Sequence, residues 1–404
     1  MTWPPMIMDR VIKPIDDAEY AERLRRVHAA LAERSWSALV VADPANLYYL
    51  TGYDAWSFYM PQCLIIPAGG APRLFLRAMD ANGAASTARL PADRIEGYPE
   101  SLVHRPDVHP YDWIADRARA QGLLPTEPDA VIAVEADAHF YSVRAHQALA
   151  ERVGRARLVD SGELVNWVRL IKSEAELDRL RIAGRLAEEA MRVALAAVAP
   201  GRRQCDVAAE IVAAQTRGTD DHGGDYPAIV PLLPSGDSAG TPHLTWSERR
   251  FCAGEATTIE LAGTYQRYHA PLARTVMIGE PSARLAGAAA VIRDGMAATL
   301  ETMLPGRPVR DTHTAFQQVI AAHGLTKDSR IGYSIGVGYP PDWGERTISL
   351  RGEEARTFGT GMAFHVILGL WLDGWGYELS EPVIISDAGA EPLCRLPREL
   401  EVTR

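Results

Sequence analysis

Residues 257–275 read TTIELAGTYQRYHAPLART, and this stretch decides how the rest of the chain is interpreted. Its first part is apolar and rich in β-branched side chains, which predicts a buried strand. Gly263 interrupts that pattern, and residues 265–276 predict a second strand. The stretch therefore indicates two successive strands, the first of which carries one acidic side chain.

That acid is Glu260, and an unpaired carboxylate in an apolar strand destabilises the fold unless something compensates its charge. One interpretation is a structural ion pair with Arg274 or Arg267, which lie nearby in the sequence. The other is a functional carboxylate, because groups in unusual environments concentrate at active sites. The stretch alone leaves both interpretations open.

The spacing of this stretch resembles the creatinase and Xaa-Pro dipeptidase superfamily, whose catalytic domain has the pita-bread fold. Its metallopeptidases carry an Asp on this strand, a second Asp eleven residues later and an Arg-Thr pair three residues beyond. Here Glu260 takes the first position, Pro271 the second, and Arg274-Thr275 the last. The frame of the motif is kept, while its metal ligands are altered.

The other ligand positions of the superfamily are altered as well. Tyr333 replaces a His, Ile367 replaces a Glu, and the last Glu position falls at Ser380, with Glu381 one residue away. A dinuclear site needs several oxygen donors and an imidazole, which Pro, Tyr and Ile cannot supply. The resemblance is thus to the metal-free branch, to which creatinase belongs, and it implies neither a metal nor another cofactor.

Composition limits the class of protein. The chain has 404 residues, 47% hydrophobic and 23% charged, which fits a globular protein of two domains. Its net charge of −10 argues against a nucleic-acid partner. No apolar run of about 18 residues predicts a membrane span, and the N-terminus lacks signal-peptide features. Four scattered cysteines predict free thiols and a cytoplasmic location.

Strand and helix patterns alternate before the boundary region near residues 165–172, which predicts an α/β domain, while residues 1–17 read as a loose lead-in. The segment DPANLYYLTG, residues 43–52, resembles the creatinase-type N-terminal domain. We therefore expect a mixed α/β (α+β) protein, with that domain over residues 1–165 and a pita-bread catalytic domain over residues 166–404.

The second domain contains an internal repeat. Ser173 begins a capping box for a helix that stops at Pro200-Gly201. Six residues of this helix and its end recur later at one constant offset, which predicts a helix, a Pro-Gly stop, an Asp cap and a second helix, written twice. The recurring residues are Met191, Leu195, Pro200, Gly201, Arg202 and Asp206, and then Met296, Leu300, Pro305, Gly306, Arg307 and Asp311.

Two histidines are candidate site residues. His243 lies in a loop rich in Gly and Pro, and it matches the position of the proposed proton-transferring His of creatinase-like members. An imidazole titrates near neutral pH, which suits that role, although a surface-loop His is the plainer interpretation. His269 follows Glu260 on the second strand and binds substrate if the strands form a hairpin, or else packs in the core.

Three further candidates lie later in the chain. The hydroxyl of Tyr333 can orient a substrate or hold an oxyanion. Trp343 can wall a pocket for a cation, or serve only as core. Glu381 forms with Glu260 a possible pair of catalytic carboxylates, or else is a solvated acid at a strand end.

Within the metal-free branch, four segments resemble the ectoine hydrolases, at residues 50–59, 223–236, 267–269 and 332–346. This resemblance adds Asp225, Trp56 and Tyr59 as substrate-binding residues and implies a homodimer in which the aromatic segment reaches the partner's site. It implies a small zwitterionic substrate, ectoine or 5-hydroxyectoine, whose cyclic amidine is opened by water. The alternatives are another creatinase-like amidinohydrolase, an Xaa-Pro-type metallopeptidase and a catalytically inactive binding module.

Overall fold

The computed structural model describes residues 15–372 and 374–403, so the lead-in expected at the N-terminus lies almost wholly outside the described residues. The described chain forms two compact units, one ending at Arg169 and the other starting at Leu170. The boundary expected after residue 165 falls inside the short helix α6 (Leu164–Val168), whereas the division follows that helix.

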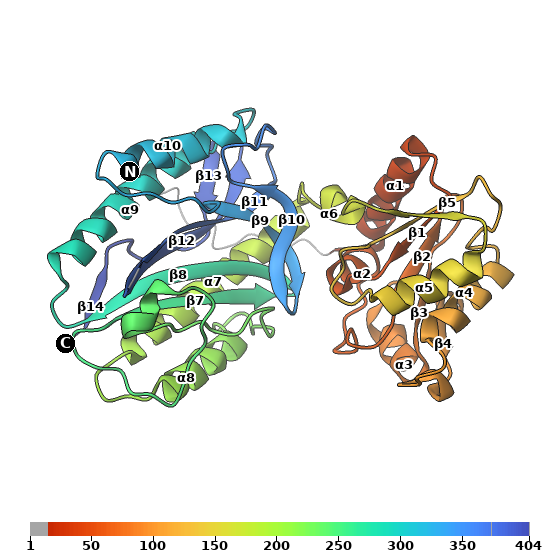
Figure 1. The fold of residues 1–404 in the computed structure, drawn as a ribbon, viewed down its shortest axis with the longest axis horizontal. Coiled ribbons are helices and arrows are strands. Elements are labelled where there is room, and N and C mark those ends of the chain that lie inside the picture. Colours follow the sequence, from red (N-terminus) through yellow and green to blue (C-terminus); the bar gives the residue numbers. More distant parts are fainter. Residues whose placement is uncertain (1–14, 373, 404) are drawn as a thin grey trace. The chain divides into compact units, whose positions relative to one another are not determined.

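The N-terminal unit is built on a six-stranded mixed sheet in the order β4-β3-β2-β1-β5-β6 (Figure 1). Strands β1, β5 and β6 are parallel, and β1, β2 and β3 are antiparallel. Its elements are α1 (Asp17–Glu33), β1 (Ala38–Val41), α2 (Pro44–Thr51), β2 (Cys63–Pro67), β3 (Arg73–Arg77), α3 (Ala78–Thr87), β4 (Ile95–Tyr98), α4 (Pro110–Ala120), β5 (Val131–Val134), α5 (Val143–Val153), β6 (Arg157–Asp160) and α6.

Helices cover both faces of this sheet, which explains why β1 is apolar at every position. Ala38 and Val40 face one core cluster, and Leu39 and Val41 face the other. Helix α2 starts at Asp43-Pro44, because the Asp43 carboxylate caps the helix and proline is tolerated at its first position.

The C-terminal unit contains an eight-stranded sheet, and Figure 1 shows α7 beside β7 and β8, with α9 and α10 near the end that carries β12 and β13. Its elements are α7 (Glu174–Ala197), α8 (Gln204–Arg217), η3 (Gly236–Gly240), β7 (Ala256–Tyr265), β8 (Tyr268–Ile278), α9 (Ala283–Thr302), α10 (Val309–Ala321), β9 (Gly332–Tyr339), β10 (Asp342–Ser349), β11 (Ala363–Leu372), β12 (Trp375–Ser386), β13 (Gly389–Pro392) and β14 (Glu401–Thr403).

The internal repeat appears as two helix pairs, α7–α8 and α9–α10, each followed by long antiparallel strands. The capping box at Ser173 is confirmed, since its hydroxyl accepts from the Glu176 N–H and the Glu176 carboxylate accepts from the Ser173 N–H. The predicted Asp caps are wrong. Asp206 and Asp311 both lie in the first turn of their helices, where an acid is stabilised by the helix dipole.

Strands β7 and β8 form one long hairpin, and the expected break at Gly263 is wrong. The chain turns at Gln266 and Arg267, both at positive φ (47° and 66°), which is the two-residue turn that suits twisted strands. Gly263 lies inside β7 because a Cβ there would come 2.1 Å from the Ala183 carbonyl oxygen. Glycine at this position lets α7 pack directly on the strand backbone.

Candidate functional site

The register of the β7–β8 hairpin places Glu260 opposite Ala273 and Thr264 opposite His269. Because directly paired residues and every second residue share a face, Glu260 and His269 lie on the same face of the hairpin. The other face carries Gly263 and packs on α7. This shared face allows other side chains to lie close to Glu260, as the functional interpretation of Glu260 requires.

Glu260 is buried, with 7% of its surface exposed, and none of the described residues forms an ion pair with its carboxylate. The proposed structural partners bind elsewhere, since Arg274 pairs with Glu381 and Arg267 with Asp225. Burial raises the pKa of Glu260 to about 7. The structure thus holds a carboxylate that changes charge near neutral pH.

A second buried carboxylate, Glu378 on β12, belongs to the same site. Its backbone N–H donates to the Thr275 hydroxyl at 2.8 Å, and that hydroxyl donates to the Glu378 carbonyl oxygen at 2.9 Å, which ties β12 to β8. Burial and the nearby charge of Glu260 raise the pKa of Glu378 well above its usual range. Its Oε1 atom is buried and has no hydrogen-bond partner among the described residues.

The prediction that Glu381 is the second site carboxylate is not supported by its position. Glu381 is an odd number of residues from Glu378 on β12, so its side chain points to the opposite face. There it accepts from Arg274 at 2.8 Å and from Arg398 at 3.0 Å. The solvated alternative is wrong, since Glu381 is fully buried and forms an ion pair with Arg274. A catalytic role of Glu381 stays a prediction.

A chain of hydrogen bonds links Tyr333 on β9 to the strands that carry the acids. The Trp343 indole N–H donates to the Tyr333 oxygen at 2.8 Å, and that hydroxyl lies 3.0 Å from His365 Nδ1. His365 Nε2 lies 2.7 Å from Ser380 Oγ, which accepts from the Ala273 N–H at 2.6 Å. Since Trp is only a donor, this favours Tyr333 donating to Nδ1 and Nε2 donating to Ser380.

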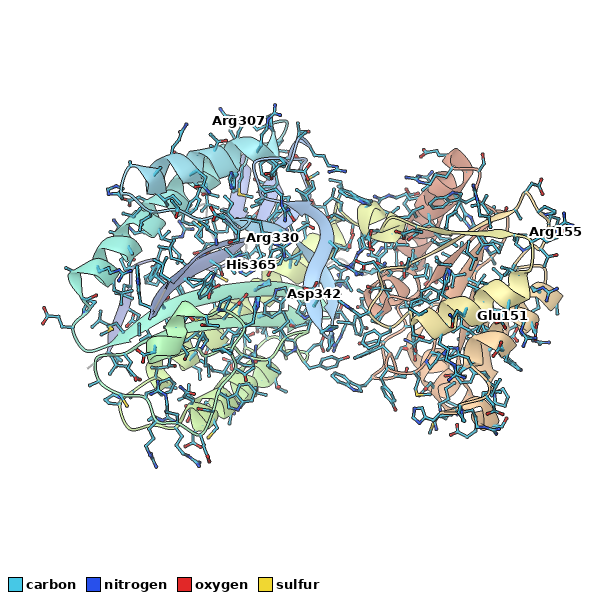
Figure 2. All side chains as sticks on the ribbon, viewed as in Figure 1. Glu151, Arg155, Arg307, Arg330, Asp342 and His365 are labelled. Atoms are coloured by element: carbon cyan, nitrogen blue, oxygen red, sulfur yellow. The ribbon has the colours of Figure 1, made fainter. Side chains whose placement is uncertain are left out.

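Burial and the Arg330 charge lower the pKa of His365 to about 3, so its imidazole is neutral. The guanidinium of Arg330 lies over the Tyr333 ring, 4.3 Å from its centroid. Arg330 precedes β9, which pairs with β11, the strand that carries His365, and Figure 2 labels both residues in this part of the C-terminal unit. Tyr333 therefore lies between a cation and a neutral hydrogen-bond acceptor.

Trp343 is fully buried and forms an apolar cluster with Ala228 and Ala262. Ala262 shares the face of Glu260, so this cluster lies along the same surface as the carboxylate. The core interpretation of Trp343 therefore holds, and its indole N–H also donates to the Tyr333 hydroxyl. Its role as the wall of a pocket for a cation stays a prediction.

His269 and Asp225 both hold backbone at the hairpin end. The Ala228 N–H donates to His269 Nε2 at 2.9 Å, and His269 Nδ1 lies 2.9 Å from the Arg267 carbonyl oxygen. Burial lowers the pKa of His269 to about 3, so it stays neutral. The Asp225 carboxylate accepts from the Arg267 N–H at 3.2 Å. Because both nitrogens of His269 are occupied, direct substrate binding by His269 would require breaking one of these bonds.

The structure does not bring the remaining candidates to the carboxylates by any contact between described residues. His243 is exposed, at a positive φ of 65°, in the loop between η3 and β7. Trp56 and Tyr59 are exposed (58% and 60%) on the N-terminal unit, flanking Phe58, which is buried against Phe140. Their roles stay predictions.

The positions that hold metal ligands in the superfamily's peptidases lie at this site. Pro271 is opposite Ala262, on the face of Glu260, while Ile367 is opposite Ser380. The described residues contain no group of three or more His, Cys, Asp or Glu side chains that could hold a metal ion. The four cysteines are free thiols, as expected. No described helix is long and apolar enough to cross a membrane.

The sequence analysis did not identify Glu378 or His365 as site residues. It named Ser380 only as an altered ligand position and did not predict its hydrogen bonds to His365 and Ala273. A signal for Glu378 was present, because it precedes Ser380 by two residues and a strand has a period of two. His365 carried no comparable signal, since its two hydrogen-bond partners, Tyr333 and Ser380, come from two other strands, β9 and β12.

Residues 178–387 match Metallopeptidase family M24, and residues 23–171 match the Creatinase/Prolidase N-terminal domain. The chain is 40% identical over 403 residues to a protein named ectoine hydrolase from Halomonas elongata, which covers 98% of this chain and 100% of the relative.

Two solved structures share the fold. Dipeptidase PepE from Mycobacterium ulcerans is 25% identical, with a TM-score of 0.77 over 96% of this chain and 99% of that chain. A prolidase from Thermococcus sibiricus is 17% identical, with a TM-score of 0.83 over 97% and 100%. The chain therefore belongs to the pita-bread superfamily, as a hydrolase with a creatinase-type N-terminal domain and an M24 domain.

Proposed function

We propose that the protein hydrolyses ectoine, opening its cyclic amidine to N-acetyl-2,4-diaminobutyrate, with 5-hydroxyectoine as a second candidate substrate. The observation that carries the proposal is the pair of buried carboxylates, Glu260 and Glu378, whose charges influence each other. The 40% identity to a named ectoine hydrolase over nearly the whole chain supports the same reaction.

The charge of the pair suits a cationic substrate. Two buried carboxylates that interact do not both ionise readily, so the pair retains one proton and one negative charge near neutral pH. An amidinium carries one positive charge spread over two nitrogens, and it would supply the partner that Glu378 Oε1 lacks within the described part of the chain. Binding would thus neutralise the remaining charge inside a buried site.

The reaction adds water to the amidine carbon and breaks one C–N bond of the ring, while a proton moves to the departing nitrogen. We assign the ionised carboxylate to Glu260, as amidinium anchor or nucleophile. We assign the carboxylic acid to Glu378, because the pKa of Glu378 is raised further by the charge of Glu260 and a protonated acid can donate to the leaving nitrogen.

Tyr333 is assigned to orientation, since its hydroxyl is fixed between Trp343 and His365. The guanidinium of Arg330, over the ring of Tyr333, is the candidate for the substrate carboxylate. His243 remains the candidate for proton transfer beyond the buried acids.

We further propose that the reaction needs no metal, because the carbon to be attacked already lies inside an amidinium. The altered ligand positions Pro271, Tyr333 and Ile367 support this. Activity should survive treatment with a chelator, and loss of activity that manganese or cobalt restores would refute the proposal. We also propose a cytoplasmic homodimer, in which the exposed Trp56 and Tyr59 reach the partner's site.

The direct test is incubation of the protein with ectoine, 5-hydroxyectoine, creatine and an Xaa-Pro dipeptide, with products identified by NMR. The proposal expects N-acetyl-diaminobutyrate from ectoine. Turnover of creatine alone would point to another amidinohydrolase. Cleavage of the dipeptide would favour the peptidase alternative, which the likeness to dipeptidase PepE supports. If no compound reacts, the pita-bread domain would be a binding module.

A further inference from the structure

Lys327 is a buried lysine for which the proposed reaction has assigned no role. It lies in the segment between α10 and β9, and its side chain is 9% exposed. Its ammonium donates to the Gly369 carbonyl oxygen at 2.8 Å and to the Ser329 hydroxyl at 2.9 Å. Both acceptors are neutral, so neither compensates the charge that the fold has buried.

The position of Gly369 places this ammonium beside the site. Gly369 on β11 pairs directly with Glu378 on β12, so the lysine is bound to the backbone next to the second carboxylate. The side chains of Lys327 and Glu378 form no direct ion pair among the described residues, and the lysine charge acts on Glu378 through space. In a buried setting of low dielectric constant, such an interaction persists over several ångströms.

The other side of Lys327 faces a surface pocket of about 640 Å³. Its charged or titratable lining residues, besides Lys327, are His313, Asp328, Arg330, Arg351 and Glu353. Glu260 faces Glu378 from β7. The charge that favours the ammonium form of Lys327 is that of Glu378, on the site side.

Burial lowers the pKa of Lys327 to about 8, and the charge of Glu378 opposes that shift. An apolar side chain of similar length at this position would avoid the free-energy cost of burying a charge, and it would need no compensating partner. The presence of a buried lysine here is therefore best explained by its interaction with Glu378.

We propose that Lys327 is a positioning residue that holds a positive charge behind Glu378 and eases the release of the Glu378 proton to the leaving nitrogen. Its catalytic meaning rests on the proposed function, whereas the electrostatic coupling between the two side chains does not. Without the lysine charge, the carboxylate form of Glu378 is less stable, and Glu378 becomes a weaker acid.

The coupling can be measured without substrate, by NMR titration of protein labelled with ¹³C at the glutamate carboxyl groups. Glu260→Gln and Glu378→Gln variants assign the two signals. Lys327→Met keeps the length of the side chain and removes its charge, and it should raise the titration midpoint of Glu378 by about 1–2 pH units, the scale of one nearby opposite charge. Ser329→Ala is the matched control, since it removes a hydrogen bond to the ammonium and keeps the charge. An unchanged Glu378 titration in Lys327→Met would overturn the inference.

Activity supplies a second readout. Lys327→Met should lower kcat about 10-fold with little change in KM, and it should move the alkaline limb of the pH profile upward. Lys327→Arg should retain most of the activity. A purely structural lysine would instead lower the melting temperature and leave the pH profile in place.

If Lys327→Met does not fold, Lys327→Arg still decides the question. In the wild-type protein, the Glu378 signal should show an inflection near pH 8, where Lys327 loses its proton. A guanidinium stays charged at this pH, so Lys327→Arg should abolish the inflection, and its persistence would contradict the proposal. A wild-type protein that shows the coupling but does not turn over ectoine would remove the proposed function and leave the coupling intact.

Discussion

Arg274 donates to Glu381 at 2.8 Å, and both side chains are buried. The same guanidinium donates to the Ser380 carbonyl oxygen at 2.7 Å, so the pair fastens β8 to β12. Glu260 and Glu378 lack such a partner among the described residues. Removing the charge of the ion-paired Glu381 should therefore mainly lower stability, whereas removing the charge of Glu260 or Glu378 should mainly lower activity.

Glu381→Gln should lower the free energy of unfolding by about 3–5 kcal/mol, because it leaves the buried Arg274 uncompensated. Its turnover per folded molecule should stay within a few-fold of the wild type. Glu378→Gln is the matched change three residues earlier, and it should lower turnover at least ~100-fold while the protein stays folded. Turnover and thermal melting of both variants test this crossover, and a stable, inactive Glu381→Gln variant would reverse our assignment.

Glu260→Gln should also lower turnover at least ~100-fold, since it keeps the shape of the side chain and removes its charge. Stability should not fall, because no ion pair of Glu260 with Arg274 or Arg267 exists to be broken. Both quantities are to be measured on one sample. Near-normal turnover with a sharply lower melting temperature would mean that Glu260 is structural.

The raised pKa of Glu260 also predicts how stability depends on pH. A carboxyl with a pKa of about 7 in the folded protein and about 4.3 in the unfolded chain stabilises the fold fully below the unfolded pKa. That contribution, about 4 kcal/mol, is lost as the pH rises from about 4 to 7. Unfolding by urea at a series of pH values should therefore show a smaller decline for Glu260→Gln than for the wild type. Equal declines would contradict the burial of an ionisable carboxyl here.

The exposed aromatic residues Trp56 and Tyr59 predict complementation between subunits. If they act in the partner's site, a Trp56→Ala, Tyr59→Ala double variant and Glu260→Gln should each be inactive as homodimers. Co-expression should restore part of the activity, because one site of the mixed dimer would hold both intact parts. Mixed dimers without activity, although they form, would exclude this arrangement.

The hairpin around Glu260 was predictable in outline, because strand propensity and the two-residue period that puts Glu260 and Ala262 on one face can both be read from the local sequence. Its turn was not, since Gln266 and Arg267 are unusual at positive φ and are held there by Asp225, a residue distant in sequence. The predicted break at Gly263 followed from a general property of glycine, whereas its actual role depends on the packing of α7.

The site was harder to predict than the fold, because its contacts cross strands. The nearness of Glu381 to the superfamily's last ligand position predicts a site role, but one residue along a strand reverses the direction of the side chain. Glu378 lies two residues before Ser380 and so points to the same face of β12. Its raised pKa depends in part on Glu260, which is more than a hundred residues away in the sequence. His365 and Lys327 become site residues only once the register of β9, β11 and β12 is known.

The close approach of α7 to Gly263 also limits how this enzyme can be altered. A Cβ at residue 263 would come 2.2 Å from the Ala187 nitrogen as well as 2.1 Å from the Ala183 carbonyl oxygen. Sliding β7 by two residues would bring Leu261 or Tyr265 into that contact, so alternative alignments of the strand are sterically excluded. Engineering of substrate range should therefore vary the loops around the site. An insertion or deletion in β7 should be avoided, because it would both displace Glu260 and bring a side chain into a clash with α7.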